Sequence, residues 1–599
     1  MQRLNLTFSQ ETTADEPDCD TSQAQLAHLK VFKFGSSVLR TPADLARVAG
    51  EIYRHTLQGA RVIAVVSALE GDTDALLDAC REAAGESDCS GIAEAVSLGE
   101  EQTAALLKIA CDRIGLSATT VRPEQFGICT SGNLLEATPI AVKGELSEAF
   151  GTANILILPG FVGIDTSGCR SLLGRGGTDF SAIFLGGELN ADLVRLYKDV
   201  DGVFDHDPAK GTEDLHRFEE VSWTDCLTLA RPLLQPKAIE YAQKKGQALE
   251  VGSIGSDQPT HVGQRSLRPK THVHPRPIRI ALAGYGTVGQ ALAERLSKEE
   301  NFEIVSILVR DCDKPRRVSP PVALTKRINS FCTPRADVLV DLTSSEETGT
   351  ALSTVWLQTE GHVITANKLV VGKGLSEFQK LGLRTDRKFL YSAAVGGSAP
   401  VLDTVRLAAS QGQIVKVTAV LNGTVNFLLD QLASGASFAV ALARAQAAGF
   451  AEEDPSQDLS GRDAELKLRI IAAQFSKPSV PIAVEALDEP LVEKIVRSGE
   501  RWLQVSSLEL SDGQLNGSAQ LRPASEVPEI VPPAGERNLV CVTIDDGRKL
   551  TASGRGAGGA ATAEAVMADL YEIWRDHALN EPSIEVETVA QLPLIQANS

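Results

Sequence analysis

The stretch PIRIALAGYGTVGQALAERL, residues 277–296, has the pattern of a strand, a tight glycine turn and a helix. Residues 278–282 are apolar and β-branched, glycines follow at GxGxxG spacing, and residues 291–296 favour a helix. Such glycines let the backbone approach a pyrophosphate, and the helix N-terminus faces the phosphates with free N–H groups. We therefore predict a Rossmann domain that binds NADP or NAD through Gly284, Gly286, Thr287, Val288 and Gly289.

A second predicted strand, residues 302–309, is followed by Arg310, about 20 residues after the last glycine, where Rossmann folds contact the adenosine ribose. A guanidinium binds a 2′-phosphate better than a bare hydroxyl group, so Arg310 favours NADP. A single GxGxxG motif is not specific, and a glycine turn in some other α/β protein is the alternative reading of this stretch alone.

The length and the charge of the chain limit its class. A chain of 599 residues is too long for one hydrophobic core and predicts roughly three or four domains. The net charge of -20 argues against nucleic-acid or membrane-surface partners, so the expected ligands are small molecules in locally basic pockets.

Targeting and cysteine patterns predict a cytoplasmic protein without metal-binding cysteines. No apolar run reaches the roughly 18 residues of a membrane span, and the N-terminus lacks a signal-peptide pattern. The ten cysteines have neither CxxC nor Cys/His ligand spacing, which predicts reduced thiols and no metal site.

The first predicted elements of the chain alternate between strands and helices. Residues 29–34 predict a strand that ends in a Gly/Ser turn, residues 42–55 a helix and residues 61–67 a buried strand, which indicates a mostly parallel sheet. Lys33 lies at the carboxyl end of its strand, where such sheets bind ligands, although a lone lysine there is more often solvated. A glycine-rich turn before a predicted helix at 180–189 suits an anion and contains Arg175, Thr178 and Asp179.

Motifs in this half of the chain resemble those of aspartate kinases, which have the amino-acid kinase fold. They are KFGSSV (33–38), VVSALEGDTDALL (65–77), SLGEE (97–101), GFVG (160–163), LGRGGTD (173–179) and DVDGVFDHDP (199–208). The resemblance covers residues 29–254 and implies phosphoryl transfer from Mg²⁺-ATP to the side-chain carboxylate of L-aspartate.

The resemblance also implies roles for single residues of these motifs. Lys33 matches the lysine that stabilises the transferring phosphoryl group, Glu100 the acid that binds the amino group of aspartate, and Arg175 the clamp on its α-carboxylate. Thr178 and Asp179 match residues beside the phosphoryl group. The implied ATP-binding residues are Lys33, Gly35, Ser36 and Asp199.

Several positions depart from the aspartate-kinase pattern. Lys198 replaces the usual Thr, Ala209 the usual Arg, and Pro232 and Gln235 the usual Lys and His. Most of these positions line the nucleotide side of the site, so they affect ATP binding more than aspartate binding. They keep open an alternative in which the kinase-like half is a binding or scaffolding module.

The second half of the chain, residues 277–575, resembles homoserine dehydrogenases. Its further motifs are DVLVDLT (337–343), HVITANKLVVG (362–372), YSAAVGGSAPVLD (391–403), LNGTVNFLL (421–429), AQAAGFAEEDPSQDLSGRDAELKLRI (445–470) and GRGAGGAATAEAVMADL (554–570). The resemblance implies NAD(P)-dependent interconversion of aspartate 4-semialdehyde and L-homoserine. The number of motifs disfavours a general NADP-binding protein unrelated to amino acids.

Asp463 and Lys467 are i and i+4 on a predicted helix and therefore share a face, although without further context a surface ion pair is the more common reason for this spacing. The resemblance assigns proton transfer to Lys467 and binding of the substrate amino group to Asp463 and Glu452. It places Lys368 between nicotinamide and substrate, and Gly556 in a segment that closes over the nicotinamide. Ser392 replaces a Glu that the family associates with a structural monovalent cation, so no metal is predicted there.

Together these patterns predict an α/β protein in which an amino-acid kinase fold precedes a Rossmann domain and an α+β homoserine dehydrogenase catalytic domain. The expected division is a tail at 1–27, the kinase at 28–254, a linker at 255–276, the Rossmann domain at 277–400, the substrate and dimerisation domain at 401–550, a return to the nucleotide domain at 551–575 and a tail at 576–599. The expected partners are small-molecule substrates, and the resemblance implies a homo-oligomer, either a dimer or a tetramer.

The segment between the two halves also predicts how the enzyme is controlled. Regulatory ACT domains usually follow the kinase in the aspartate-kinase family, and the polar, Pro- and Gly-bearing segment 252–277 is too short for even one of them. Allosteric control requires a second site whose ligand distinguishes two global states. We therefore expect neither activity to respond to threonine or lysine, apart from weak competition by threonine at the homoserine site. Sigmoidal, noncompetitive inhibition in steady-state assays would refute this prediction.

Overall fold

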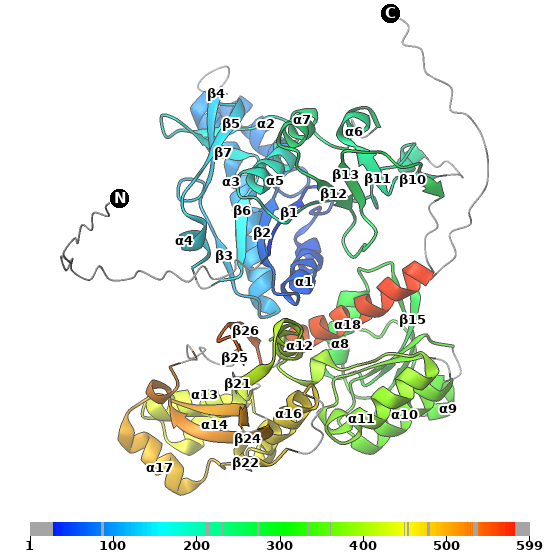
Figure 1. The fold of residues 1–599 in the computed structure, drawn as a ribbon, viewed down its shortest axis with the longest axis vertical. Helices are drawn as coiled ribbons and strands as arrows, with labels where there is room; N and C mark the ends of the chain where they lie inside the picture. Colours follow the sequence, from blue (N-terminus) through cyan, green and yellow to red (C-terminus); the bar gives the residue numbers. More distant parts are fainter. Residues whose placement is uncertain are drawn as a thin grey trace, which may run out of the picture.

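The computed structural model describes residues 28–84, 89–151, 153–210, 215–229, 233–271, 276–332, 335–359, 361–448, 450–451, 454–475, 480–511, 513–528, 530, 537–556 and 558–580. Glu452, Pro232 and residues 1–27 lie outside these ranges. The first half of the chain forms the upper body in Figure 1 and the second half forms the lower body. The C-terminal helix α18 (Gly559–Asn580, red) lies between them, so the tail predicted from residue 576 begins inside a helix.

The N-terminal half is built on an eight-stranded sheet of order β11-β13-β12-β9-β1-β2-β6-β3, in which only β12 and β13 pair antiparallel among the described strand pairs. The strands are β1 (Leu29–Phe34), β2 (Arg61–Val66), β3 (Ala118–Thr120), β6 (Ile155–Pro159), β9 (Leu193–Tyr197), β11 (Glu220–Ser222), β12 (Leu249–Gly252) and β13 (Thr260–Gly263). A second, four-stranded sheet of order β5-β4-β7-β8 contains β4 (Gly127–Asn133), β5 (Glu136–Lys143), β7 (Val162–Asp165) and β8 (Arg170–Leu172).

Helices cover both faces of the large sheet. Alternate residues of β1 enter different cores, because Val31 packs with α5 and α7 whereas Phe32 and Phe34 pack with α1 and α3. A parallel sheet buried on both faces favours strands that are apolar on both sides, which explains the apolar run at 62–66 and the apolar residues of 29–34, where Lys30 and Lys33 interrupt the pattern. The helices are α1 (Leu45–Thr56), α2 (Asp72–Ala84), α3 (Cys89–Arg113), α5 (Gly177–Glu188), α6 (Trp223–Leu229) and α7 (Pro236–Lys245).

The segment predicted as a linker contributes strands to the first half instead. β13 pairs with β11 and β12 in the large sheet, and β14 (Lys270–Thr271) pairs with β10 (His216–Arg217). Thr260 and Val262 of β13 are fully buried. The prediction of a linker from residue 255 is therefore wrong for this stretch, since the surrounding polar residues hide a short strand whose pairing partners are distant in sequence.

The middle of the chain forms the predicted Rossmann domain. Its six strands are parallel in the order β17-β16-β15-β18-β19-β20, with β15 at the point where the order reverses. They are β15 (Ile278–Ala283), β16 (Phe302–Leu308), β17 (Leu324–Thr325), β18 (Val338–Asp341), β19 (His362–Thr365) and β20 (Phe389–Leu390). The accompanying helices include α8 (Thr287–Leu296), α10 (Glu346–Thr359) and α11 (Lys368–Thr385).

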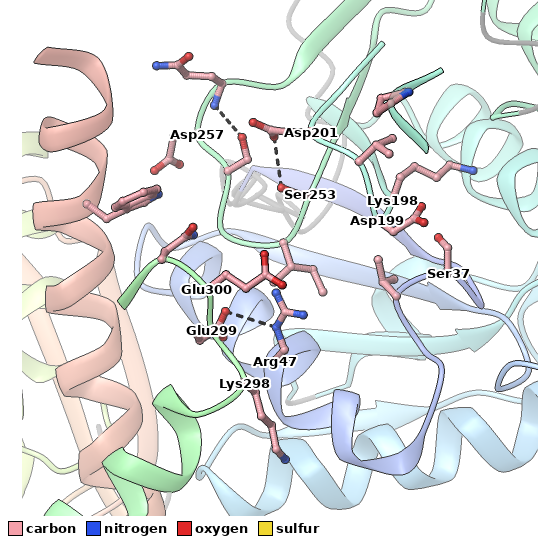
Figure 2. A pocket seen from close by; sticks show the side chains of 18 of the residues that line it. Ser37, Arg47, Lys198, Asp199, Asp201, Ser253, Asp257, Lys298, Glu299 and Glu300 are labelled. Carbon is pink, nitrogen blue, oxygen red and sulfur yellow. Dashed lines mark hydrogen bonds and ion pairs between the residues drawn. The ribbon is translucent and has the colours of Figure 1, made fainter. Parts of the chain in front are cut away.

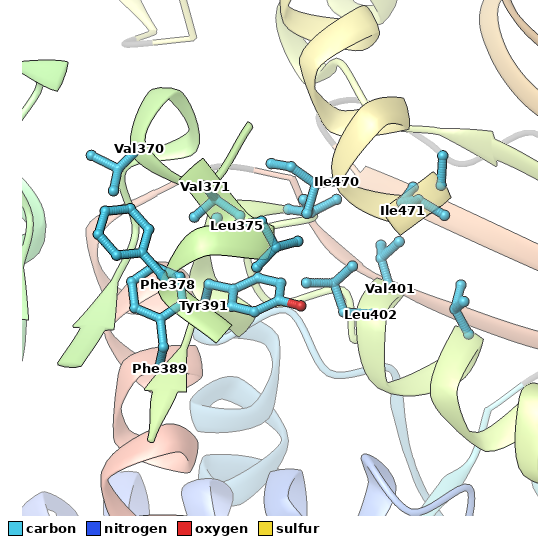
Figure 3. Close-up of a cluster of buried hydrophobic side chains, with 14 of the residues drawn as sticks. Val370, Val371, Leu375, Phe378, Phe389, Tyr391, Val401, Leu402, Ile470 and Ile471 are labelled. Carbon is cyan, nitrogen blue, oxygen red and sulfur yellow. The ribbon is translucent and has the colours of Figure 1, made fainter. Parts of the chain in front are cut away.

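The third domain contains a mixed six-stranded sheet of order β22-β24-β23-β21-β25-β26. β22 pairs parallel with β24 and the other pairs are antiparallel. The strands are β21 (Ile414–Val420), β22 (Ile482–Val484), β23 (Trp502–Ser511), β24 (Gln514–Pro523), β25 (Arg537–Ile544) and β26 (Lys549–Arg555), and the nearby helices include α12 (Val401–Gln411), α13 (Gly423–Ala433) and α16 (Arg462–Ala473). One continuous core joins this domain to the Rossmann domain, with Phe378 and Tyr391 packed toward Leu402 and Ile470 (Figure 3).

Helix α18 returns the chain to the Rossmann domain. Val566 and Leu570 share a core with Leu292 and Leu296 of α8. A Cβ added at Gly559 would lie 2.9 Å from the carbonyl oxygen of Thr287, so the absence of a side chain permits this close approach.

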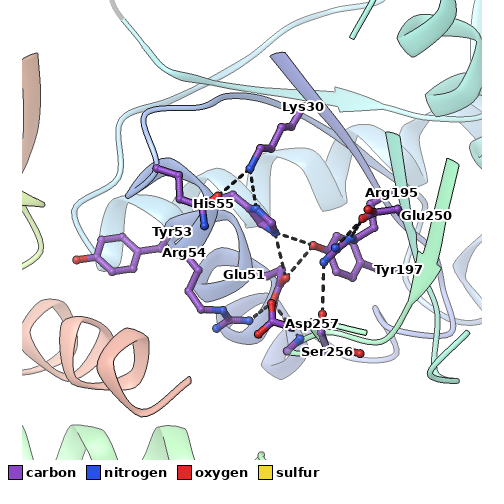
Figure 4. A network of polar contacts seen from close by, with 12 residues as sticks. Lys30, Glu51, Tyr53, Arg54, His55, Arg195, Tyr197, Glu250, Ser256 and Asp257 are labelled. Atoms are coloured by element: carbon purple, nitrogen blue, oxygen red, sulfur yellow. Dashed lines mark hydrogen bonds and ion pairs between the residues drawn. The ribbon is translucent and has the colours of Figure 1, made fainter. Parts of the chain in front are cut away.

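A buried polar network connects the two halves (Figure 4). Glu51 on α1 accepts hydrogen bonds from the Tyr197 hydroxyl group (2.7 Å) and the Gly255 amide (3.0 Å), and it forms an ion pair with Arg54. The Arg54 guanidinium lies 3.8 Å from the ring centroid of Tyr571 on α18. Because buried charges are tolerated only when they are paired, this network favours one fixed packing of α18 against the N-terminal half.

Candidate active sites

Three buried charges meet at the carboxyl ends of β1 and β9. Lys33 Nζ lies 2.8 Å from Asp179 Oδ1, and Lys198 Nζ lies 2.9 Å from Asp179 Oδ2. β1 and β9 are neighbours in the sheet, and Asp179 lies in the first turn of α5, where the helix N-terminus faces the same edge. The cluster carries two positive charges and one negative charge, so an anion is favoured beside it.

The environment shifts the pKa values of this cluster. Burial lowers the pKa of Lys33 to about 8, against the attraction of Asp179. Burial alone would raise the pKa of Asp179, but Lys198 and Lys33 outweigh it and hold that pKa below its usual range. Asp179 is therefore ionised and holds both lysines in place.

Lys198 is the residue of this site whose role the sequence did not predict. It was recognised only as a departure from the kinase pattern, yet it contacts Asp179 and donates a 2.7 Å hydrogen bond to the Leu233 carbonyl oxygen. Gln235, another departure, donates to the Arg175 carbonyl oxygen at 2.9 Å. The sequence did contain a signal for Lys198. Lys33 and Lys198 lie at the carboxyl ends of two strands, and parallel pairing of these strands places both lysines at the same edge of the sheet.

Glu100 lies apart from this cluster, on α3, and is 2% exposed. Its Oε1 accepts a 3.3 Å hydrogen bond from the Ala68 amide, whereas Oε2 is buried without a partner among the described residues. Burial raises the pKa of Glu100 to about 7, despite that hydrogen bond. A buried carboxylate oxygen without a partner suits the ammonium group of an amino acid.

The remaining predicted residues of the first site surround the cluster. Thr178 is buried beside Gly160, whereas the Arg175 side chain is exposed after a glycine with φ of 75°. A Cβ at Gly35 would lie 2.1 Å from Lys33 Nζ, so a larger residue there would force the end of the lysine side chain to shift. Ser36 and Asp199 are exposed at the ends of β1 and β9, where a nucleotide would have access.

A second lysine–aspartate cluster lies between the Rossmann domain and the third domain. Asp463 on α16 pairs with Lys368 at the start of α11 and with Lys467 at 2.7 Å, which confirms the predicted i, i+4 contact. Asn422 Nδ2 also donates to Asp463 Oδ2 at 3.0 Å. Burial alone would raise the pKa of Asp463, but the two lysines lower it to about 2. Asp463 therefore stays ionised and positions both lysines.

Two residues of this cluster were not among the predicted site residues. Asn422 caps α13 by accepting a hydrogen bond from the Val425 amide, and it donates to Asp458 at 2.9 Å. Burial, with repulsion from Asp463, raises the pKa of Asp458. Asn422 lies inside the LNGTVNFLL motif and Asp458 inside the 445–470 motif, so both could have been noticed there, but the contact between them joins residues 36 positions apart.

The glycine turn after β15 has the shape that a dinucleotide requires. A Cβ at Gly284 (φ 102°) would lie 2.8 Å from the Leu342 carbonyl oxygen, and one at Gly289 would lie 2.4 Å from the Gly284 carbonyl oxygen. At Gly286 no atom lies within 4 Å, so open space faces the N-terminus of α8, which begins with Thr287 and Val288. This cradle fits a pyrophosphate.

Arg310 and Gly556 flank the cradle from different elements. Arg310 is exposed just beyond the carboxyl end of β16. Gly556 follows β26 and approaches Gly397, whose added Cβ would lie 2.8 Å from the Gly556 carbonyl oxygen. The roles that the resemblance implies for these two residues stay predictions.

Ser392 is the position at which the sequence predicts no metal. Its amide donates to Asp569 Oδ2 at 3.1 Å, and burial raises the pKa of Asp569 to about 8. No group of three or more His, Cys, Asp or Glu residues that could hold a metal occurs in the ranges that the structure describes. Within those same ranges, no helix is long and apolar enough to cross a membrane, and the cysteines are free.

Comparisons with known proteins identify a family for each half of the chain. The chain matches the homoserine dehydrogenase NAD-binding domain over residues 284–386 and the homoserine dehydrogenase catalytic family over residues 400–571. A homoserine dehydrogenase from Synechocystis sp. is 30% identical over 316 residues, which cover 49% of this chain and 73% of that protein. The chain belongs to the homoserine dehydrogenase family.

The first half of this homoserine dehydrogenase family member matches the amino acid kinase family over residues 28–253. An aspartokinase from Helicobacter pylori is 31% identical over 220 residues, which cover 36% of this chain and 54% of that protein. The chain therefore spans about half the length of that aspartokinase. A solved homoserine dehydrogenase from Thiobacillus denitrificans is 27% identical, covers 51% of this chain and 76% of that chain, and has a TM-score of 0.46.

Proposed function

We propose that the chain is a bifunctional enzyme of amino-acid biosynthesis. One half phosphorylates L-aspartate to 4-phospho-L-aspartate with Mg²⁺-ATP, and the other interconverts aspartate 4-semialdehyde and L-homoserine with NADP or NAD. The observation that supports this most is a lysine–aspartate cluster around a buried aspartate in each half. Lys33 and Asp179 of the kinase motifs meet Lys198 in one cluster, and Lys368, Asp463 and Lys467 of the dehydrogenase motifs form the other.

In the kinase half, the residues act by position and charge. Phosphoryl transfer requires cations around the transferring group rather than a covalent nucleophile. Lys33 and Lys198 supply that charge, and Asp179 fixes their ammonium groups before substrate arrives, so little reorganisation is needed. Glu100 binds the amino group of aspartate through its free oxygen, and Arg175 is available for the α-carboxylate.

In the dehydrogenase half, the nicotinamide cofactor accepts the hydride when it is bound. Lys467 takes the hydroxyl proton of homoserine, and its hydrogen bonds to Asp463 and to the Leu421 carbonyl oxygen (2.6 Å) fix the position of its Nζ. Lys368 is held by the same carboxylate. Because the chain's own donors occupy Asp463, we assign it mainly to positioning these lysines, which leaves the substrate amino group to Glu452.

The dehydrogenase half is tested by oxidation of L-homoserine in the presence of NADP or NAD, followed through the absorbance of the reduced cofactor. The proposal expects homoserine-dependent reduction that stops when aspartate 4-semialdehyde accumulates. Reduction of cofactor with other amino alcohols but not with homoserine would refute it.

We also propose that the chain forms a homo-oligomer. Light scattering on the purified full chain measures its mass, and the mass of a monomer would contradict this proposal.

Arg310 provides a prediction about the cofactor. Arg310→Ala is expected to raise the KM for NADP about 10- to 100-fold and to leave the KM for NAD nearly unchanged, because only NADP carries a phosphate for the guanidinium. Steady-state kinetics with each cofactor measure the effect. Arg384→Ala, an exposed arginine on α11, is the matched control and should change neither KM. Equal losses for NADP and NAD would exclude this role for Arg310.

Glu100 provides a prediction about pH. Its carboxylate binds an ammonium only when ionised, so the KM for aspartate should rise as pH falls below about 7, the value to which burial raises the pKa of Glu100. Glu100→Gln should raise this KM about 10- to 100-fold at pH 8 and abolish the dependence on pH. If the variant retains the wild-type pH profile, another group binds the amino group.

A further inference from the structure

A cavity of about 490 Å³ lies between the kinase half and the dehydrogenase half. Its kinase wall includes Ser37, Lys198, Asp199 and Phe204, and its dehydrogenase wall comprises residues 298–301 with Trp574 and Arg575 of α18. Figure 2 shows Glu299 and Glu300 of the dehydrogenase half across the cavity from Ser37 and Asp199 of the kinase half. The volume lies within the range of small-molecule sites, about 300 to 1,000 Å³.

One end of this cavity is the proposed phosphoryl-transfer site. Lys198 lines the cavity and pairs with Asp179, which also holds Lys33. A nucleoside triphosphate with its terminal phosphate at these lysines must extend its ribose and base away from them. The same cavity is also lined by Phe204 and reaches the dehydrogenase wall, where the exposed part of the Trp574 side chain, 6% of it, is available for contact with a base.

Ion pairs between the two halves hold the dehydrogenase wall in place. Arg47 on α1 lies 3.3 Å from Glu299, and Arg575 on α18 lies 2.8 Å from Asp257. Lys298 Nζ donates to the Ala43 carbonyl oxygen at 3.2 Å. Glu299 is buried, and Arg295 and Arg47 hold its pKa below the usual range although burial alone would raise it. The wall is therefore part of the packed structure and not a separate surface that happens to lie nearby.

We propose that the nucleoside triphosphate of the kinase reaction binds in this cavity, with its adenosine end against residues 298–301 and Trp574. The dehydrogenase half then completes the nucleotide site of the kinase half. This inference rests on the proposed kinase function for its ligand. It also explains why most departures from the aspartate-kinase pattern line the nucleotide side of the site. A cavity wall supplied by the dehydrogenase half changes which residues of the kinase half contact the nucleotide.

Glu300→Trp tests the proposal on the full chain. Glu300 is exposed at the cavity wall, so a Trp side chain fits without disturbing a core and fills the space that the adenosine requires. Calorimetric titration with Mg²⁺-ATP should show binding that is at least 10-fold weaker than in the wild type, and NADP binding should be unchanged. Glu303→Trp, the same substitution at an exposed position outside the cavity wall, is the matched control and should bind Mg²⁺-ATP normally.

The fluorescence of Trp574 provides a second, independent measurement of nucleotide binding in the cavity. Mg²⁺-ATP should change the tryptophan emission of the wild type, and Trp574→Phe should remove most of that change. Unaltered Mg²⁺-ATP affinity in Glu300→Trp, or no binding of Mg²⁺-ATP by the wild type, would overturn the proposal. Binding that depends on Glu300 without formation of acyl phosphate would support the shared site and reject the kinase reaction, so the two failures are distinguishable.

Discussion

Lys467→Ala is expected to lower the turnover of homoserine oxidation by about 10²- to 10⁴-fold while NADP still binds. The lysine is the proposed acceptor of the hydroxyl proton, and it lies on a face of α16 where Asp463 and the Leu421 carbonyl oxygen fix its Nζ. Asp463 keeps Lys368 as a partner in the variant, so no buried carboxylate is left unpaired and the fold should survive. Steady-state kinetics together with a direct NADP titration measure the effect.

Two further variants show whether Lys467 transfers a proton or only supplies a positive charge. Lys467→Arg keeps a cation beside Asp463, but a guanidinium does not lose its proton at accessible pH, so turnover should remain low. Lys373→Ala removes an exposed lysine that pairs with Glu346 on the surface and should leave turnover unchanged. Near-normal turnover in Lys467→Arg would show that Lys467 contributes only charge.

Lys33→Ala is expected to lower the rate of aspartate phosphorylation by about 10²- to 10³-fold, because it removes one of the two buried cations that face the transferring phosphoryl group. The dehydrogenase rate should not change. Asp179 retains Lys198 in the variant, which again avoids an unpaired buried charge. Lys237→Ala, an exposed lysine paired with Glu136, is the matched control. A comparable loss in both activities of Lys33→Ala would indicate general unfolding rather than a catalytic role.

Local patterns explain the parts of the fold that the sequence predicts well. The strand, turn and helix at 278–296 depend on periodicity and on glycines whose neighbours are close in sequence, and the structure has β15 and α8 there. The contact between Asp463 and Lys467 depends only on helix geometry and is present. The resemblance to known families named Lys33 together with Asp179, and Lys368 together with Asp463, and each of these pairs is in contact although its members are far apart in sequence.

Long-range packing explains what the sequence did not predict. Lys198 contacts Asp179 because β9 lies beside β1, a pairing between segments far apart in sequence. β13 was missed because its four residues are too few for a periodic pattern, and its partners β11 and β12 define it. The close approach of Lys33 Nζ to Gly35 arises from the path of the lysine side chain, which no spacing rule describes.

The central claim is that one chain carries both activities in separate clusters, and the most direct test is trapping of acyl phosphate with hydroxylamine. The wild-type chain is incubated with Mg²⁺-ATP and L-aspartate, and the hydroxamate formed is compared with that of Lys33→Ala and Lys467→Ala. We predict aspartate-dependent hydroxamate with the wild type and with Lys467→Ala, and only background with Lys33→Ala. Hydroxamate from the wild type that does not exceed the Lys33→Ala background would contradict the account and favour a kinase-like scaffolding module.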